Sequence, residues 1–161
     1  RIHHPNQSAF TKGRYILDGV LILHEMIHEV KTKHLRAVFF KIDFHKAYDT
    51  VHWSFLREVL LKRGFDPHWV ARVMQLVTSG RTAVNINGEI GPYFTTGQGV
   101  RQGDPISPML FITVMEPLQR MFELATERGL LTPLASMGMK HRLSMYADDV
   151  MLFVQPLEED L

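Results

Sequence analysis

The fold is decided by the stretch Arg142-Leu143-Ser144-Met145-Tyr146-Ala147-Asp148-Asp149-Val150-Met151-Leu152-Phe153-Val154. Two apolar runs, 142–146 and 150–154, flank the tight turn Ala147-Asp148-Asp149. Short apolar runs on either side of such a turn are typical of a β-hairpin. Two adjacent aspartates repel each other, and a turn needs at most one of them for its own hydrogen bonds. The second carboxylate therefore indicates a functional role in addition to a structural one.

A second apolar run, residues 36–44, predicts another strand and carries an aspartate at its end. Alternation along this strand places Lys41 and Asp43 on the same face. Taken singly, an aspartate in a turn or at a strand end is ordinary. On strand ends of one sheet, however, Asp43, Asp148 and Asp149 could converge on a divalent metal. Mg²⁺ is held by a few carboxylates plus substrate phosphates, and two such ions about 4 Å apart serve in-line phosphoryl transfer.

The rest of the chain predicts helices and a second hairpin. Asn87-Gly88 suits a type I′ turn between residues 82–86 and 90–94, because both turn positions need a positive φ. Helices mixed with antiparallel hairpins indicate an α+β fold with helices packed on one sheet face. Helices are predicted at 15–33, at 54–63 with Ser54 as N-cap and Gly64 at C′, and at 67–79 with Asp66 as N-cap. A glycine-rich loop at 97–105 precedes a fourth helix, which is predicted to run to Gly129 with Ser107 as N-cap and Pro108 at N1.

Length and composition exclude several classes of protein. The 161 residues fit one domain or slightly more, and the absence of cysteine excludes a disulfide scaffold, a thiolate zinc site and a cysteine nucleophile. Eighteen Lys+Arg against seventeen Asp+Glu leave a net charge of +1, so charge gives no sign of a nucleic-acid-binding stripe. No apolar run approaches the roughly eighteen residues of a transmembrane helix, so no membrane partner is expected. The start at Arg1, without an initiator Met, predicts a fragment.

A zinc site is the first alternative. His24-Glu25-Met26-Ile27-His28 matches the H-E-x-x-H pattern, in which two histidines bind zinc and the glutamate acts as base. His34 falls where an extended pattern has its third ligand, but Lys31 replaces the glycine that lets the chain turn back. If the helix continues, His34 lies about 120° around from His28 and roughly 9 Å further along the axis, too far to share a tetrahedral metal. We therefore favour a helix with both histidines at its partly exposed edge over a zinc hydrolase using His24, Glu25 and His28.

Four blocks, in order, resemble the reverse transcriptase domain of non-LTR (LINE-type) retrotransposons, particularly those abundant in plant genomes. Asn6-Gln7-Ser8-Ala9-Phe10-Thr11-Lys12-Gly13-Arg14 resembles the block after the first fingers motif. The other three blocks resemble the three palm motifs of the family. The first is Lys41-Ile42-Asp43-Phe44-His45-Lys46-Ala47-Tyr48-Asp49, the second is Arg101-Gln102-Gly103-Asp104-Pro105-Ile106-Ser107-Pro108-Met109-Leu110-Phe111, and the third is Tyr146-Ala147-Asp148-Asp149.

The resemblance implies a right-hand polymerase palm with partial fingers. By the family layout, residues 1–34 and 52–103 are fingers-like, and residues 35–51 and 104–161 are palm. The thumb, the remaining fingers and an endonuclease are expected to lie in other parts of the parent polyprotein.

The implied activity is that of an RNA-directed DNA polymerase with two Mg²⁺ ions, for which Mn²⁺ is a substitute. Asp43 and Asp148 would hold both ions with the Phe44 carbonyl nearby, and Asp149 would support the same site. The ions would activate a primer 3′-hydroxyl, align it on the α-phosphate of a dNTP and neutralise the departing pyrophosphate.

Further residues take nucleotide-binding roles from the resemblance. Tyr48, an ordinary core aromatic by spacing alone, matches the ring that excludes a 2′-hydroxyl and so selects deoxynucleotides. Gln102 and Gly103 match the loop that packs on the incoming nucleotide and template. The triphosphate would contact backbone amides of His45, Lys46, Ala47 and Tyr48, and the candidate nucleic-acid contacts are the basic residues Lys12, Arg14, Lys41 and Arg101.

The implied partners are an RNA template, a DNA primer and dNTPs, and the parent element is expected to act in the nucleus. Without a thumb to clamp the duplex, this stretch alone is expected to have little or no processive activity. The second alternative is a decayed element whose palm survives only as a fold or as a nucleic-acid-binding module.

Overall fold

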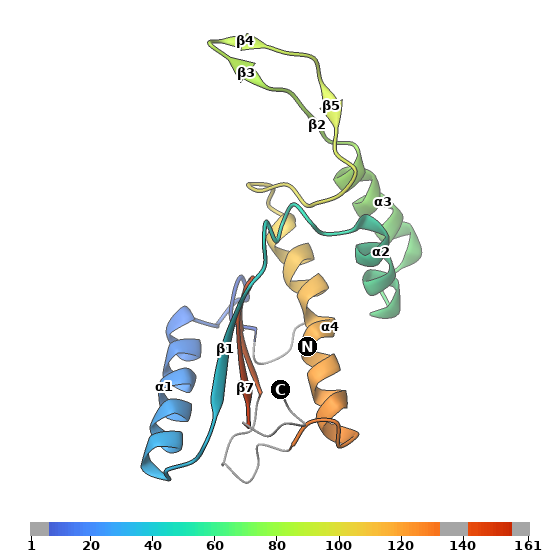
Figure 1. Ribbon diagram of the computed structural model, residues 1–161. Coiled ribbons are helices and arrows are strands. Elements are labelled where there is room, and N and C mark those ends of the chain that lie inside the picture. Colours follow the sequence, from blue (N-terminus) through green and yellow to red (C-terminus); the bar gives the residue numbers. More distant parts are fainter. Residues whose placement is uncertain (1–6, 133–141, 156–161) are drawn as a thin grey trace. The chain divides into compact units, whose positions relative to one another are not determined.

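The computed structural model describes residues 7–132 and 142–155 (Figure 1). The chain divides into two compact units. The first combines Arg1–Phe44 with Met115–Leu161, and the second is His45–Val114.

An antiparallel three-stranded sheet forms the centre of the first unit. Its strands are β1 (Val38–Asp43), β7 (Asp149–Val154) and β6 (Leu143–Tyr146), in the order β1-β7-β6. The predicted strand and the predicted hairpin are therefore both confirmed. The register places Asp43 directly opposite Asp149.

The hairpin turn is one residue tighter than the sequence predicted. Ala147 and Asp148 form the turn, whereas Asp149 already belongs to β7 and pairs with Tyr146 on β6. Ala147 has a φ of 53°, in the left-handed region.

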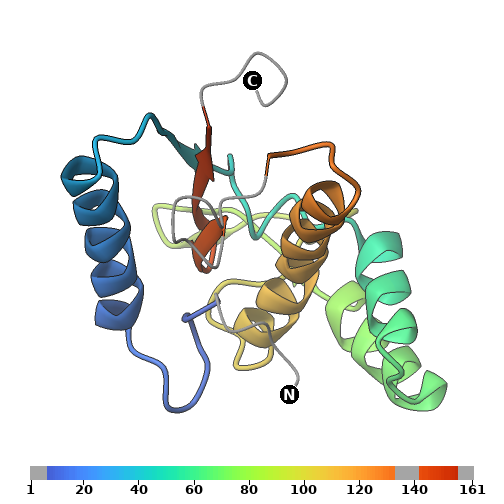
Figure 2. The same cartoon turned by 90° about the horizontal axis from the view of Figure 1, so that it is seen from below.

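Helices flank both faces of this sheet (Figures 1 and 2), whereas the sequence predicted helices on one face. Helix α1 (Ile16–Thr32) buries Met26 and Val30 against Phe153, whose ring meets Phe39 edge-on at 4.8 Å. The C-terminal half of α4 (Ser107–Glu127) lies on the other side.

The apolar side chains of α1 are only partly buried. The core-facing residues recur at helical spacing in its second half, while the first half leaves large apolar side chains in contact with solvent. The exposed ones are Ile16, Leu17, Val20, Leu21 and Ile22.

The second unit contains two helices and an extended arm. Helix α2 (Trp53–Lys62) and helix α3 (Pro67–Thr78) pack together, and the arm follows them. Two ladders build the arm, β2 (Arg81–Thr82) with β5 (Phe94–Thr95) and β3 (Asn85–Ile86) with β4 (Glu89–Ile90). The predicted type I′ turn is confirmed, because Asn87 and Gly88 have φ values of 53° and 92°.

The sequence predicted the N-cap correctly for α3 but not for the other helices for which a cap was predicted. Asp66 caps α3 as expected, its carboxylate accepting from the amides of His68 and Trp69 at 3.0 Å. Ser54 as a cap is wrong, since α2 begins at Trp53 with His52 in the cap position and no side-chain cap bond. Ser107 as a cap is also wrong, since α4 begins at Ser107 itself and the Ile106 carbonyl before it already accepts from the amide of Leu110 at 3.1 Å.

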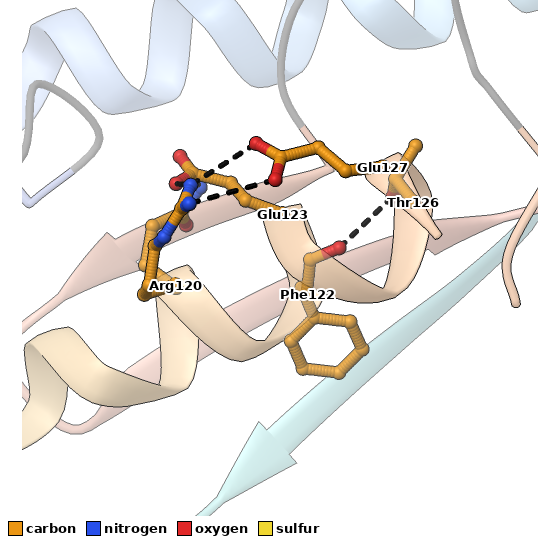
Figure 3. A network of polar contacts seen from close by, with 6 residues as sticks. Arg120, Phe122, Glu123, Thr126 and Glu127 are labelled. Carbon is orange, nitrogen blue, oxygen red and sulfur yellow. Dashed lines mark hydrogen bonds and ion pairs between the residues drawn. The ribbon is translucent and has the colours of Figure 1, made fainter. Parts of the chain in front are cut away.

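The last turns of α4 carry an exposed ion-pair network (Figure 3). Arg120 donates to Glu123 at 3.2 Å and to Glu127 at 3.1 Å, and these hydrogen bonds raise the pKa of its guanidinium.

Among the described residues, no helix combines the length and the apolar character needed to cross a membrane.

Candidate catalytic site

Three aspartates lie at one end of the first unit's sheet, and we call Asp43, Asp148 and Asp149 the acidic cluster. Asp43 ends β1 and Asp149 starts β7, so the register sets them opposite each other. Side chains in such a pair have Cβ atoms about 5 Å apart. Asp148 precedes Asp149 in the turn, and it is half-buried while the other two are exposed. The fold therefore brings together three acids that come from two distant parts of the sequence.

The charge of the acidic cluster is only partly balanced. Two carboxylates directly opposite on neighbouring strands destabilise a sheet. Lys41, on the same face of β1, places its Nζ 3.3 Å from Asp149 Oδ1. Both side chains of that ion pair are exposed, so it contributes little. A divalent cation would relieve the remaining repulsion between Asp43 and Asp149.

The donor set of the acidic cluster fits Mg²⁺. Within residues 7–132 and 142–155, no three His, Asp or Glu side chains are grouped closely enough to enclose a metal ion. Mg²⁺ does not need such a cage, because one or two carboxylates with waters and substrate phosphates complete its shell. The pair Asp43 and Asp149, with Asp148 beside it, offers hard oxygen donors of this kind.

The zinc alternative is wrong for the described residues. His24 and His28 are exposed on α1, and no third His, Asp or Glu among the described residues is grouped with them to hold a metal ion. His28 Nε2 lies 3.3 Å from Thr32 Oγ1. His34 lies beyond the end of α1 with a φ of 51°.

The residues after Asp43 form a compact turn. Phe44 is half-buried, and Lys46 has a φ of 47°. The Lys46 carbonyl accepts from the amides of Asp49 and Thr50 at 2.8 and 3.1 Å. His45 is exposed like Lys46, while Ala47 is buried and anchors the turn.

Tyr48 stacks on a residue of α4 that sequence reasoning did not single out. Its ring lies parallel to that of Phe111, with centroids 4.4 Å apart and an interplanar angle of 13°. Phe111 is 1 % exposed, so it provides a fixed platform for the Tyr48 ring. The position of Phe111 one turn into the helix after Ser107 was the available sequence signal.

The glycine-rich loop is fastened to the turn that contains Tyr48. Gly99 and Val100 donate backbone hydrogen bonds to Val51 and Tyr48, both at 2.8 Å. The Trp53 indole donates to the Gly99 carbonyl at 2.7 Å. At Gly99, with a φ of 92°, a Cβ would lie 2.8 Å from the Asp49 carbonyl oxygen, so no side chain fits.

Gln102 lines a cleft of about 640 Å³ in the second unit. The cleft is bounded mainly by the glycine-rich loop from Gly97 to Gln102, together with Asp49 and Thr82. Gly103, with a φ of 88°, has open space where a Cβ would be. Gln102 and Gly103 thus lie on an accessible stretch of the loop.

Of the four candidate basic contacts, three have partners within the protein. Arg101 donates to the Leu76 carbonyl of α3 at 3.1 Å, Arg14 donates to the Gln7 carbonyl, and Lys41 pairs with Asp149. Lys12 is exposed. Contact of these four residues with nucleic acid stays a prediction.

Comparison with known proteins assigns the family. Residues 1–161 match the family described as Reverse transcriptase (RNA-dependent DNA polymerase). The chain belongs to the reverse transcriptase family. The resemblance read from its four blocks is thereby confirmed.

Relatives of this reverse transcriptase come from transposable elements. A Xenopus laevis protein named Transposon TX1 uncharacterized 149 kDa protein is 34 % identical over 156 residues, which are 96 % of this chain and 12 % of that protein. The Pol polyprotein from the type-2 retrotransposable element R2DM of Drosophila melanogaster is 29 % identical over 153 residues, 94 % of this chain and 14 % of that protein. The chain thus spans about an eighth of the length of these relatives.

Solved telomerase structures share the fold. Apo telomerase from Candida tropicalis matches with a TM-score of 0.62 and 15 % identity, over 94 % of this chain and 30 % of the other. Telomerase from Candida albicans in complex with a fragment of telomeric RNA matches with a TM-score of 0.63 and 12 % identity, over 89 % and 27 %. The expected α+β palm-type fold of a partial reverse transcriptase is confirmed.

Proposed function

We propose that the protein containing this chain is the RNA-directed DNA polymerase of a LINE-type retrotransposon, and that the acidic cluster is its catalytic metal site. One observation supports this most strongly: Asp43 and Asp149 face each other in register, with Asp148 next to them. Two like charges in this register destabilise the sheet in the absence of a cation, and a bound cation would remove that cost. The arrangement therefore supports a cation-binding role for the acidic cluster. Membership of the reverse transcriptase family and the transposon relatives support the substrate class.

In this proposal the acidic cluster binds divalent cations, two Mg²⁺ ions with Mn²⁺ as a substitute. Held there, such cations would supply Lewis acidity toward phosphate oxygens and toward a primer 3′-hydroxyl. Asp43 and Asp148 act as the ligands, Asp149 supports them, and the Phe44 carbonyl is a further oxygen donor. Lys41 holds Asp149 on the shared face of the sheet and limits the negative charge of the free site.

The second unit supplies the proposed nucleotide contacts. The turn from His45 to Ala47 offers backbone amides to the triphosphate, and Gln102 and Gly103 offer a loop surface to the nucleotide and template. Tyr48, fixed by stacking on Phe111, is proposed to exclude a 2′-hydroxyl because an immobile ring cannot move aside for it.

The partners in this proposal are an RNA template, a DNA primer and dNTPs. The division into palm (35–51 and 104–161) and fingers-like residues (1–34 and 52–103) stays a prediction, as does the need for the remaining parts of the polyprotein for processive synthesis. We also propose that the parent element acts in the nucleus, where its DNA target lies.

Primer extension by the full-length protein on an RNA template tests the assignment. Asp148→Asn is expected to lower the rate by at least about a thousandfold, because it removes a carboxylate needed to neutralise charge in the transition state. Glu89→Gln, an exposed acid on β4, is the matched control and is expected to retain full activity. An Asp148→Asn variant that extends primers at the normal rate would show that the metal site lies elsewhere.

The alternative of a decayed element makes a different prediction for the same assay. That alternative predicts RNA binding by the parental protein without Mg²⁺-dependent synthesis.

Tyr48→Ala tests the proposed selection of deoxynucleotides, since it is expected to raise ribonucleotide incorporation relative to deoxynucleotide incorporation. Unchanged sugar selectivity in an active Tyr48→Ala enzyme would remove the selective role of this ring.

A further inference from the structure

A glutamine far from the acidic cluster in sequence is completely buried beside its turn. Gln7 is 0 % exposed. Its backbone forms a parallel bridge with Met145 on the edge of β6, and the next amide, that of Ser8, donates to the Met145 carbonyl at 3.1 Å. The chain at Gln7 and Ser8 therefore pairs with the edge strand β6 of the hairpin.

The side chain of Gln7 bonds the backbone of the turn itself. Its Oε1 accepts from the amide of Ala147 at 3.0 Å and from the amide of Ala9 at 3.0 Å. Its Nε2 donates a longer bond to the Ala147 carbonyl at 3.5 Å. A single side chain thus contacts both backbone polar groups of one residue, while Arg14 donates to the Gln7 carbonyl and fixes it from the other side.

Ala147 is the residue of the turn that most needs such support. Its φ of 53° is in the left-handed region, which L-residues other than asparagine and aspartate rarely adopt. It is also 6 % exposed, so water does not solvate its amide in place of Gln7. The residues that follow it, Asp148 and Asp149, take their direction from this conformation.

We propose that Gln7 is a positioning residue for catalysis, and that it holds Ala147 in its left-handed conformation so that Asp148 and Asp149 stay aligned with Asp43. This inference rests on the proposed function of the acidic cluster. It assigns a catalytic purpose to a residue in the N-terminal block, in which the candidate nucleic-acid contacts are Lys12 and Arg14. It also explains why a wholly buried polar side chain lies at this position, where an apolar one would leave two amides unpartnered.

The test combines four variants of the full-length protein. Gln7→Leu keeps the volume and removes the hydrogen bonds, and Gln7→Asn keeps the amide but withdraws it by one methylene. Ala147→Gly, combined with Gln7→Leu, removes the conformational penalty that Gln7 is proposed to counter. Gln119→Leu is the matched control, because Gln119 is a buried glutamine of α4, 3 % exposed, whose Nε2 bonds Glu123.

Two readouts are measured on each variant. The first is hydrogen exchange of peptides covering residues 143–149, which does not depend on activity. The second is primer extension with kcat and KM determined separately. Gln7→Leu and Gln7→Asn are expected to speed exchange in the turn and to lower kcat, each by about 10- to 100-fold, with KM for the dNTP within about twofold.

Rescue separates positioning from a general loss of stability. Ala147→Gly in the Gln7→Leu background is expected to recover part of the lost kcat, whereas Gln119→Leu is expected to change neither turn exchange nor kcat. Unchanged exchange and kcat in both Gln7 variants would overturn the inference, and so would a loss of kcat that Ala147→Gly does not recover. If the unmodified protein shows no synthesis at all, the proposed function fails, and the exchange measurement alone decides whether Gln7 holds the turn.

Discussion

Asp43→Asn is expected to make the metal-free protein more stable, although it removes a residue of the proposed catalytic site. Asp43 is exposed and faces Asp149 across the pair of strands β1 and β7. The substitution keeps the shape of the side chain and removes one of two like charges. The free energy of unfolding should therefore increase by the repulsion that is removed, because the substitution breaks no contact on which the sheet depends.

The magnitude follows from the register. Two unit charges about 5 Å apart in water repel by about 0.8 kcal/mol, within the range of about 0.2–1 kcal/mol for cross-strand pairs. Asp149→Asn should behave differently, because it also removes the ion pair with Lys41 at 3.3 Å. That exposed ion pair contributes little, so Asp149→Asn should be stabilised somewhat less than Asp43→Asn.

Urea unfolding at low ionic strength, with and without Mg²⁺, measures both effects. A cation bound only by the folded state stabilises it by about 1.4 kcal/mol at ten times its Kd, and Asp43→Asn should abolish most of that gain. Glu89→Gln on β4 is the control and should follow the unmodified protein in both conditions. A destabilised metal-free Asp43→Asn variant would rule out repulsion between Asp43 and Asp149, and a full response of that variant to Mg²⁺ would show that Asp43 does not bind the cation.

Three further outcomes are expected from unfolding measurements. Gly99→Ala should destabilise the protein by more than about 1 kcal/mol, because its Cβ would lie 2.8 Å from the Asp49 carbonyl oxygen at a positive φ; a neutral effect would mean that the loop can shift. A double-mutant cycle with Tyr48→Leu and Phe111→Leu should give a coupling energy of about 0.5–1.5 kcal/mol for the stacked rings, and additive effects would contradict the contact. Asp66→Ala should cost about 1 kcal/mol through the loss of the α3 cap, whereas an unchanged stability would argue against that cap.

The features that the sequence predicted correctly are those encoded by neighbouring residues. Asn87-Gly88 identified its hairpin, and Asp66 identified the start of α3, since each depends on residues within a few positions. Ser54 was wrongly predicted as a cap because the start of α2 does not depend on neighbouring residues alone. Trp53, the first residue of α2, donates its indole N–H to the carbonyl of Gly99, 46 positions away.

The candidate site was predicted in composition but not in geometry. The spacing of residues shows that Asp43 ends a strand and that Asp148 and Asp149 lie near a turn. It does not fix the register that sets Asp43 opposite Asp149, because several registers between two apolar strands keep the same faces buried. Phe111 could not be paired with Tyr48 for a related reason, since stacking depends on how the helix packs on the turn.

The bond between Gln7 and Ala147 spans 140 positions, and it explains why the turn contains alanine where glycine would be unstrained. An L-residue in the left-handed region costs about 1–2 kcal/mol, whereas glycine enters it freely but also enters many other conformations. A glycine turn would therefore adopt the observed conformation only part of the time. An alanine held at both its amide and its carbonyl has few alternatives, because leaving the turn breaks buried hydrogen bonds to Gln7. The strain at Ala147 is offset by contacts that form only when Gln7 is in place, and this makes the direction of Asp148 and Asp149 depend on the N-terminal segment.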